Sequence, residues 1–572
     1  MKVVIVDGYS DEPSGLGVPP FLDVYARYAA GAVWEAEPSA EVVYLTIDQV
    51  RRSVESFVKL AEGCSLLVFI AGVCVPGKYL GGEPIKLREL KELPSLVEGP
   101  VKVLGGPAAR FGIGLEGGRL AKLPSEVEDA FDLVAAGDVD AVLSDLLSEK
   151  LNVEAVDPAR RRRGFEEVEG KAVRGARVVR QHPCYGKNLV VEVETYRGCP
   201  RFITGGCSFC IEPLYGAPEF RRAEAVAAEV AALYAEGVDR FRLGRQPDIL
   251  CYMAEGVGEV EYPKPSPAMV ERLFRAVRAA APLLKTLHID NVNPGTIVAH
   301  PAEAEECLKV IVKYHTPGDV AAMGVESVDP AVVRANNLKV DFEGALKAME
   351  LVNRVGRQRG YGGLPHLLPG VNFVYGLINE RRETFELNLE LMREALRRGL
   401  LVRRVNLRQV MVFPGTRMWA VGDRIVKRHK SLFKAHKVRM REEFDKPMLK
   451  RLLPHWTLLR DAYVEAYGKG LTYARQPGSY PILLCVRSRL PLDRYGDFFV
   501  VDHGHRSITA APYPLDLNRA ERKLLESLPG VGVRRAARLM ALRPFSDASS
   551  LEEALGDPKL ASRLAALARL GA

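Results

Sequence analysis

The chain has 572 residues, 47% of them hydrophobic, and a formal net charge of +8 at pH 7. This length exceeds what one hydrophobic core usually supports, so we expect three or four domains. No apolar run is long enough to cross a membrane, and the amino terminus lacks a basic region followed by a long apolar segment, which predicts a cytoplasmic protein. The nine scattered cysteines are typical of a reducing compartment, and the mild positive charge permits an anionic partner.

Residues 1–150 predict a Rossmann-like α/β domain. Valine- and leucine-rich segments alternate with helical patterns and indicate buried strands at 1–7, 65–70, 101–107 and 133–138. We interpret Cys64 and Cys74 as reduced thiols, of which Cys74, in a loop flanked by Gly and Pro, is the better functional candidate. A G-x-G-x-x-G pattern at 112–117 does not join a strand directly to a helix, so we assign it no nucleotide.

Two basic segments flank the central region. Residues 151–187 predict a basic linker, and the run from Arg160 to Arg163 is typical of a solvated connector. With a nucleic-acid partner, this run could contact phosphates. Residues 426–470 predict a basic connector that is helical.

The most informative feature of residues 188–425 is a loop with three cysteines. A valine-rich strand at 188–194 leads into the loop, which carries Cys199, Cys207 and Cys210. A structural zinc ion takes four ligands, and Cys184, Cys251 or a histidine would have to supply the fourth. A cubane iron–sulfur cluster held by three thiolates keeps one iron open for a substrate, which is the interpretation we favour.

After this loop, strands and helices alternate along the chain. The strand patterns lie at 239–243, 285–290, 319–327, 369–376 and 404–413, with helical patterns between them. Together with the strand before the cysteines they make six, which predicts a parallel sheet closed into a partial (β/α)6 barrel. Active sites of such sheets lie at the carboxyl ends of the strands, where the cysteine loop also falls.

The segment Tyr196-Arg-Gly-Cys-Pro200, followed by Cys207-Ser-Phe-Cys210, resembles the cluster loop of the radical S-adenosylmethionine (SAM) superfamily. The resemblance implies a [4Fe–4S] cluster whose open iron binds SAM, an electron donor, and cleavage of SAM to methionine and a 5′-deoxyadenosyl radical. The seven residues between Cys199 and Cys207 depart from the usual three. Gly205 and Gly206 can let the longer loop fold back.

The resemblance also implies positions that bind SAM at the ends of later strands. Gly244-Arg-Gln departs from the family, because no acid follows the glycine directly. The remaining positions come from the third, fourth and sixth strands. The full set is Gly244, Arg245, Gln246, Asn291, Asn293, Glu326, Ser327, Arg334, Pro414 and Gly415.

The carboxyl-terminal third predicts two small modules. Strand patterns at 481–486, 497–502 and 506–510 indicate a small β domain over 471–517, whose position is similar to that of the RNA-binding barrel of methylthiotransferases. Residues 518–572 resemble a helix-hairpin-helix, with helical patterns on either side of Leu528-Pro-Gly-Val-Gly532. Backbone N–H groups of such a hairpin can hold a phosphate. Packing or protein contact is the alternative. The residues assigned to nucleic acid are Gly530, Gly532, Arg534, Arg535 and Arg538.

The order of these segments resembles an archaeal radical SAM family with a carboxyl-terminal helix-hairpin-helix. We therefore predict a radical SAM enzyme, a transferase that methylates or methylthiolates RNA, with tRNA as the leading substrate. One alternative is radical chemistry on a protein or a small metabolite, and another is a non-catalytic metalloprotein that binds nucleic acid. Residues 1–150 also resemble domains that bind cobalamin or a second cluster. Neither cofactor is supported by the residues, because no histidine precedes His182 and only two cysteines are present; any cobalamin bound there would lack a histidine ligand from this domain.

Overall fold

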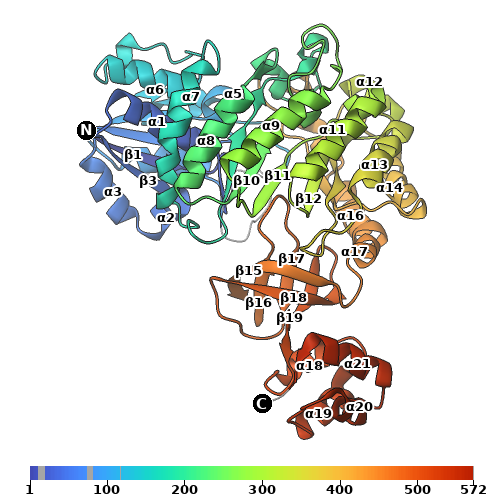
Figure 1. Cartoon of the computed structure of the whole chain (residues 1–572). Helices are drawn as coiled ribbons and strands as arrows, with labels where there is room; N and C mark the ends of the chain where they lie inside the picture. Colours follow the sequence, from blue (N-terminus) through green and yellow to red (C-terminus); the bar gives the residue numbers. More distant parts are fainter. Residues whose placement is uncertain (11–17, 19, 74–81, 116, 571–572) are drawn as a thin grey trace.

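The computed structural model describes residues 1–10, 18, 20–73, 82–115 and 117–570. It is a mixed α/β protein with parallel sheets, followed by a closed barrel of five strands and a helical tail (Figure 1). Cys74 lies outside the described residues. Among the described residues, no helix is both long and apolar enough to cross a membrane.

The amino-terminal part contains a five-stranded parallel sheet of order β3-β1-β4-β5-β6. This is the strand order of a doubly wound domain. The sequence pattern located four of these strands and missed β3, which lies at the edge of the sheet and is only partly buried. The strands are β1 (Lys2–Asp7), β3 (Glu41–Thr46), β4 (Leu66–Ile70), β5 (Val101–Gly105) and β6 (Leu133–Val134).

The predicted linker over residues 151–187 is instead part of the packed core. Its helix α7 lies against α1 so closely that a Cβ on Gly31 would come within 2.0 Å of the Lys171 carbonyl oxygen. Arg162 is buried and pairs with Asp140 at 2.8 Å, so this arginine is not solvated as predicted. The basic run gave a wrong prediction for Arg162 because a buried carboxylate, here Asp140, needs a buried cation beside it. The helices of this part are α1 (Val24–Ala36), α2 (Ile47–Arg52), α3 (Val54–Glu62), α4 (Leu87–Ser95), α5 (Pro107–Phe111), α6 (Val139–Ser148) and α7 (Glu166–Gly175).

The central part is built on two parallel sheets of order β11-β10-β7-β2 and β12-β13-β14. A bridge from Asn291 to Ala322 joins them, so the strands form one curved series whose outer members are β2 and β14. Six of the strands follow the predicted alternation; β2 was missed, because it reaches this sheet from the amino-terminal part. The strands are β2 (Phe21–Leu22), β7 (Val190–Glu194), β10 (Arg240–Gly244), β11 (Thr286–Ile289), β12 (Asp319–Glu326), β13 (Leu367–Tyr375) and β14 (Arg404–Gln409).

Amphipathic helices cover the outer face of these sheets (Figure 1). Helix α9 shows why: it buries Val270, Leu273, Phe274 and Val277, which share one face at helical spacing. The helices are α8 (Ala223–Ala235), α9 (Pro267–Ala280), α10 (Pro294–Ala299), α11 (Pro301–Tyr314), α12 (Pro330–Asn336), α13 (Phe342–Gly356) and α14 (Arg382–Arg397).

The connector predicted as helical over residues 426–470 ends sooner than expected. Helices α15 (Arg424–Arg428), α16 (Lys430–Met440) and α17 (Lys446–Leu452) are followed by a strand, β15 (Leu458–Gly468). Cross-strand packing makes this segment a strand and not a helix. The rings of Tyr463 and Tyr495, for example, lie 5.2 Å apart on paired strands. The closed barrel consists of β15, β16 (Leu471–Arg475), β17 (Leu483–Val486), β18 (Arg494–His503) and β19 (Ser507–Tyr513).

The tail has four helices, α18 (Arg522–Ser527), α19 (Gly532–Ala541), α20 (Ala548–Leu555) and α21 (Pro558–Leu567). It packs on the barrel through a shared apolar cluster that includes Phe499 and Leu525. Near the end of the chain, β21 (Ala568–Arg569) pairs in parallel with β20 (Leu515–Asp516), which follows the barrel.

Candidate active site

The loop with three cysteines begins directly after β7 and β8 (Tyr196–Arg197). Residues Pro200–Thr204 form a 3₁₀ helix, which takes up most of the long interval between Cys199 and Cys207. Gly205 and Gly206 follow with φ of +76° and +59°, a left-handed conformation that favours glycine. The two glycines therefore return the chain toward Cys199, as the sequence suggested.

The three cysteines line one cavity of about 100 Å³. The cavity lies at the carboxyl ends of β10 to β13, which is the edge of a parallel sheet where ligands bind. Strand ends and connecting loops supply its polar lining. These polar residues are Arg201, Glu212, Asp248, Asn291, Asn293, Glu326, Lys339 and Asn372.

The spacing of the thiols fits an iron–sulfur cluster better than a zinc ion. Among the described residues, only His455, Asp502 and His503 place three ligand atoms within 4.8 Å of one another, so the three cysteines do not. A tetrahedral zinc ion with Zn–S bonds of about 2.3 Å would hold its thiolates about 3.8 Å apart. A multi-iron cluster is wider and binds one thiolate at each of three corners.

The side chains proposed as a fourth zinc ligand lie elsewhere. Cys251 is buried beside Tyr196, and Cys184 donates its backbone N–H to His182 Nδ1 at 3.0 Å. Neither residue lines the cavity, and no histidine is among the described residues that do. Among the described residues, the only thiols that line the cavity are therefore Cys199, Cys207 and Cys210, and three thiolates leave one corner of a cubane open.

Two cations compensate the charge of the thiolates. Arg201 Nη1 donates to Cys207 Sγ at 3.1 Å, and Lys339 Nζ lies 3.4 Å from Glu326 Oε1. Burial alone would lower the pKa of Lys339. The negative charges of Cys207 and Glu326 have the larger combined effect, so the pKa of Lys339 lies above its usual value. Burial raises the pKa of the Cys199 thiol to about 12, so an ionised Cys199 needs a metal or a cation beside it.

Asp248 connects the carboxyl ends of β10 and β11, which also line the cavity. Its carboxylate accepts the Asn293 N–H at 3.0 Å and the Thr296 hydroxyl at 2.7 Å, and burial raises its pKa to about 6. Asn293 in turn caps α10 by accepting the Gly295 N–H at 2.9 Å. Asn291 donates its side-chain amide to the Gln246 carbonyl at 3.2 Å. Both asparagines are therefore held on the cavity wall.

The structure brings three of the ten predicted SAM positions to the cavity: Asn291, Asn293 and Glu326. Arg245 points away, toward Glu194 at 3.5 Å and Tyr25 at 2.6 Å. Gln246 hydrogen-bonds Leu243 and Thr195, Ser327 hydrogen-bonds Asn388, and Arg334 is exposed on α12. Gly244 packs against Glu192, and the turn at Pro414 and Gly415 packs against Leu214, outside the lining.

Sequence reasoning missed five polar residues of the lining: Arg201, Glu212, Asp248, Lys339 and Asn372. Asp248 carried a usable signal, because it is the first acid after the Gly244 turn. Lys339 carried none, since it enters the cavity from the connection between α12 and α13.

The family model of the radical SAM superfamily matches residues 193–375, which contain all three cysteines and the strand ends around the cavity. The chain belongs to the radical SAM superfamily. Its cofactors are accordingly a [4Fe–4S] cluster and SAM.

Two archaeal relatives match almost the whole chain. An uncharacterized protein of Methanocaldococcus jannaschii is 44% identical over 512 residues, which cover 89% of this chain and 92% of the relative. An uncharacterized protein of Archaeoglobus fulgidus is 43% identical over 559 residues, 96% of this chain and 97% of the relative. Among solved structures, the radical SAM methyltransferase TsrM from Kitasatospora setae is similar, with 14% identity, a TM-score of 0.45 and coverage of 73% and 75%.

Proposed function

We propose that this radical SAM enzyme abstracts a hydrogen atom from a substrate placed beside the cysteine cavity. The observation that carries the proposal is the convergence of three thiols and the polar ends of β10 to β13 on one buried cavity. When bound, the cluster supplies the electron that cleaves SAM to methionine and a 5′-deoxyadenosyl radical.

The chain's own residues hold and shield the reactants. Arg201 and Lys339 offset thiolate charge, and Asn291 and Asn293 present polar groups from fixed strand ends. Cys199, Cys207 and Asp248 in the cavity wall are buried, which limits the access of water to a reactive radical.

Anaerobic reconstitution tests this proposal. We expect about four irons and four sulfides per chain, and 5′-deoxyadenosine when the protein is reduced in the presence of SAM. Bound zinc without sulfide would reject the proposal, as would full cluster content with no cleavage of SAM under a strong reductant.

We further propose RNA as the substrate, with methylation or methylthiolation of a base as the outcome. The support is the tail, where Gly530 and Gly532, with φ of +83° and +60°, turn the chain between α18 and α19. Such a helix-hairpin-helix holds a phosphate with backbone N–H groups and does not read bases. The helix-hairpin-helix also supports the proposal that the chain belongs to the archaeal radical SAM family with this motif at its carboxyl terminus.

The three arginines assigned to the tail differ in their surroundings. Arg535 donates to the Gly530 carbonyl at 2.6 Å, and Arg538 donates to the Glu553 carbonyl at 2.9 Å, so both stabilise the tail itself. Arg534 is exposed and has no ion pair with any described residue. We therefore assign the contact with a phosphate to Arg534.

RNA binding is tested by Arg534→Gln, with the exposed Arg382→Gln on α14 as a control that removes the same charge elsewhere. Losing one phosphate contact should reduce the slope of log affinity against log salt by slightly less than one unit. An unchanged slope in Arg534→Gln would remove the tail from the binding surface. Comparing modified tRNA nucleosides with and without the gene identifies the reaction.

For the amino-terminal part we propose no second iron–sulfur cluster. Cys64 is buried at the edge of β4, and burial raises its thiol pKa, as for a reduced core cysteine. Iron counting tests this, since two full clusters per chain would contradict it.

A further inference from the structure

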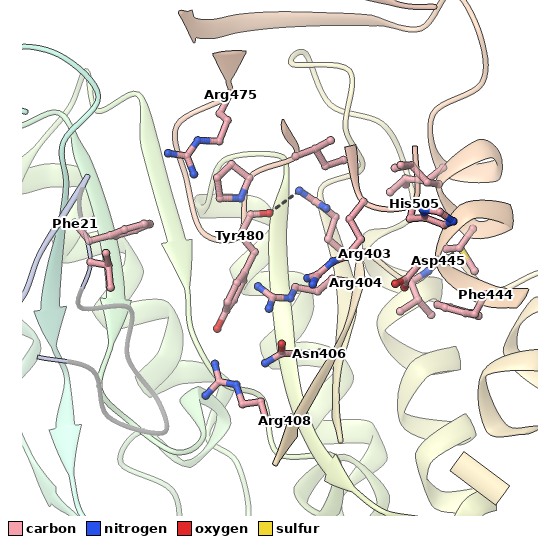
Figure 2. Close-up of a pocket in the computed structure, with 18 of the residues that line it drawn as sticks. Phe21, Arg403, Arg404, Asn406, Arg408, Phe444, Asp445, Arg475, Tyr480 and His505 are labelled. Carbon is pink, nitrogen blue, oxygen red and sulfur yellow. Dashed lines mark hydrogen bonds between the residues drawn. The ribbon is translucent and has the colours of Figure 1, made fainter. Parts of the chain in front are cut away.

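A second cavity, of about 320 Å³, lies between the two outer strands of the curved series, β2 and β14 (Figure 2). Parts of the five-stranded barrel and α17 close its other sides. We call it the arginine pocket, after the five arginines among its described lining residues: Arg403, Arg404, Arg408, Arg475 and Arg506. Asp445 is the only carboxylate among those described residues.

One face of β14 connects this pocket with the cysteine cavity. Arg404, Asn406 and Arg408 alternate along the strand and line the pocket, while Val405 between them is buried on the opposite side (Figure 2). Asn406, which lines the pocket, is the register partner of Asn372 on β13, and Asn372 lines the cysteine cavity. The row of polar side chains therefore runs from the pocket toward the cluster.

Two of the arginines form no ion pair with any residue that the structure describes. Arg403 Nη2 donates to the Tyr480 carbonyl at 2.6 Å, but its buried Nε has no hydrogen-bond partner among the described residues. Burial, together with Arg404 and Arg506, lowers the pKa of Arg403 to about 9. Arg506 is exposed and forms no ion pair with a described residue. Arg475, in contrast, pairs with Glu465 at 2.7 Å.

The remaining lining suits an organic anion rather than a bare ion. The guanidinium of Arg404 lies 4.1 Å from the ring centroid of Tyr480, and Phe21, Met448 and Ile482 add apolar surface. A cavity of this volume is at the small end of ligand sites. Several guanidinium groups around one point match the oxygens of a phosphate, which they bind through paired N–H donors.

We propose that the arginine pocket binds a phosphate group of the substrate and directs the carbon to be modified along β14 toward the cluster. That this ligand is the substrate rests on the proposed radical reaction. Arg404 and Arg408 are four residues apart on a strand, which is about 13 Å, a span suited to a nucleotide-sized ligand. The phosphate belongs either to a free organic phosphate or to the backbone of RNA, since the chemistry of recognition is the same.

Binding by the reconstituted full-length protein tests the pocket. Calorimetry would use three probes: pyrophosphate, adenosine 5′-monophosphate and a short RNA. We expect Arg403→Gln and Arg506→Gln to weaken binding by about tenfold or more, because each loses a charged hydrogen bond. Arg382→Gln, on α14 and outside the lining of the pocket, should bind like the wild type. Arg506 is exposed, so its replacement does not threaten folding.

The three probes separate the two sources of the phosphate. Weaker binding of pyrophosphate and the nucleotide indicates a free organic phosphate, and an effect confined to RNA indicates a backbone phosphate; either supports the proposal. Equal affinities in the wild type and both pocket variants would overturn it, as would the absence of binding for all three probes. SAM cleavage by the wild type is measured separately, so failure of the radical reaction is distinguishable from failure of the pocket.

Discussion

The cysteine cavity and the arginine pocket lie on the same curved series of strands but are built in opposite ways. All three predicted cluster ligands of the first come from twelve consecutive residues, 199–210, on one loop. The second collects side chains from β2, β14, α17 and the barrel, over residues 18–506. Cofactor chemistry is thus encoded locally, where few residues suffice to hold a cluster. Recognition of a substrate depends on surfaces that only the folded chain brings together.

The largest expected effect comes from removing one of the three cysteines on the loop of the cysteine cavity. Cys207→Ala should abolish both the cluster and the formation of 5′-deoxyadenosine, because two thiolates cannot hold the cubane. Cys184→Ala, which removes a thiol outside the cavity, should retain both. Iron and sulfide analysis with product chromatography measures this. Normal cleavage of SAM by Cys207→Ala would mean that the loop does not bind the cluster.

Two neighbouring glycines test how far the loop itself forms the site. A Cβ on Gly206 would come within 2.3 Å of Pro213 Cγ, whereas a Cβ on Gly205 meets nothing within 4 Å. Both substitutions place alanine in a left-handed conformation at a cost of roughly 1–2 kcal/mol. We expect Gly206→Ala to lose most of its iron and Gly205→Ala to keep most of it. Equal iron contents would show that Pro213 yields to the added methyl group.

Lys339 tests the part of the cysteine cavity that the loop does not supply. Lys339→Met removes a buried positive charge near Cys207, so reduction of the cluster should become harder by roughly 50–100 mV. The matched variant is Lys347→Met, on the exposed face of α13. Redox titration followed by electron paramagnetic resonance reports the potential. The same potential in both variants would exclude an electrostatic role for Lys339.

The smallest effect concerns Asp445 in the arginine pocket. Burial raises its pKa to about 6, against the opposing charges of Arg506, Arg441 and Arg404 and of His505. As the pH falls from 8 to 5 the carboxylate takes up a proton, the pocket loses a negative charge, and sulfate, which does not titrate here, should bind more tightly. Asp445→Asn should bind sulfate roughly threefold more tightly at pH 8 and depend less on pH. Identical pH profiles would place Asp445 outside the binding site.

Local patterns predicted the helices and strands of the central region well, and failed where distant contacts decide the outcome. The alternation from 188 to 413 gave six strands close to their observed positions. The basic run at Arg160 to Arg163 suggested a solvated linker, yet Arg162 is buried against Asp140, a partner 22 residues away. The segment at 458–468 was assigned to a helix because its strand character depends on pairing with β16 and β18.

By itself, the sequence determined the three cysteines, the glycines that turn their loop and the order of strands and helices, because spacing along the chain fixes all of these. The tertiary structure decided which of the predicted polar residues line the cysteine cavity: Asn291, Asn293 and Glu326 do, whereas Arg245 and Ser327 turn to other partners. It also added Lys339 and formed the arginine pocket. The physical reason is that the direction of a side chain depends on which buried charges and surfaces the fold places beside it, and residues far apart in the sequence supply them.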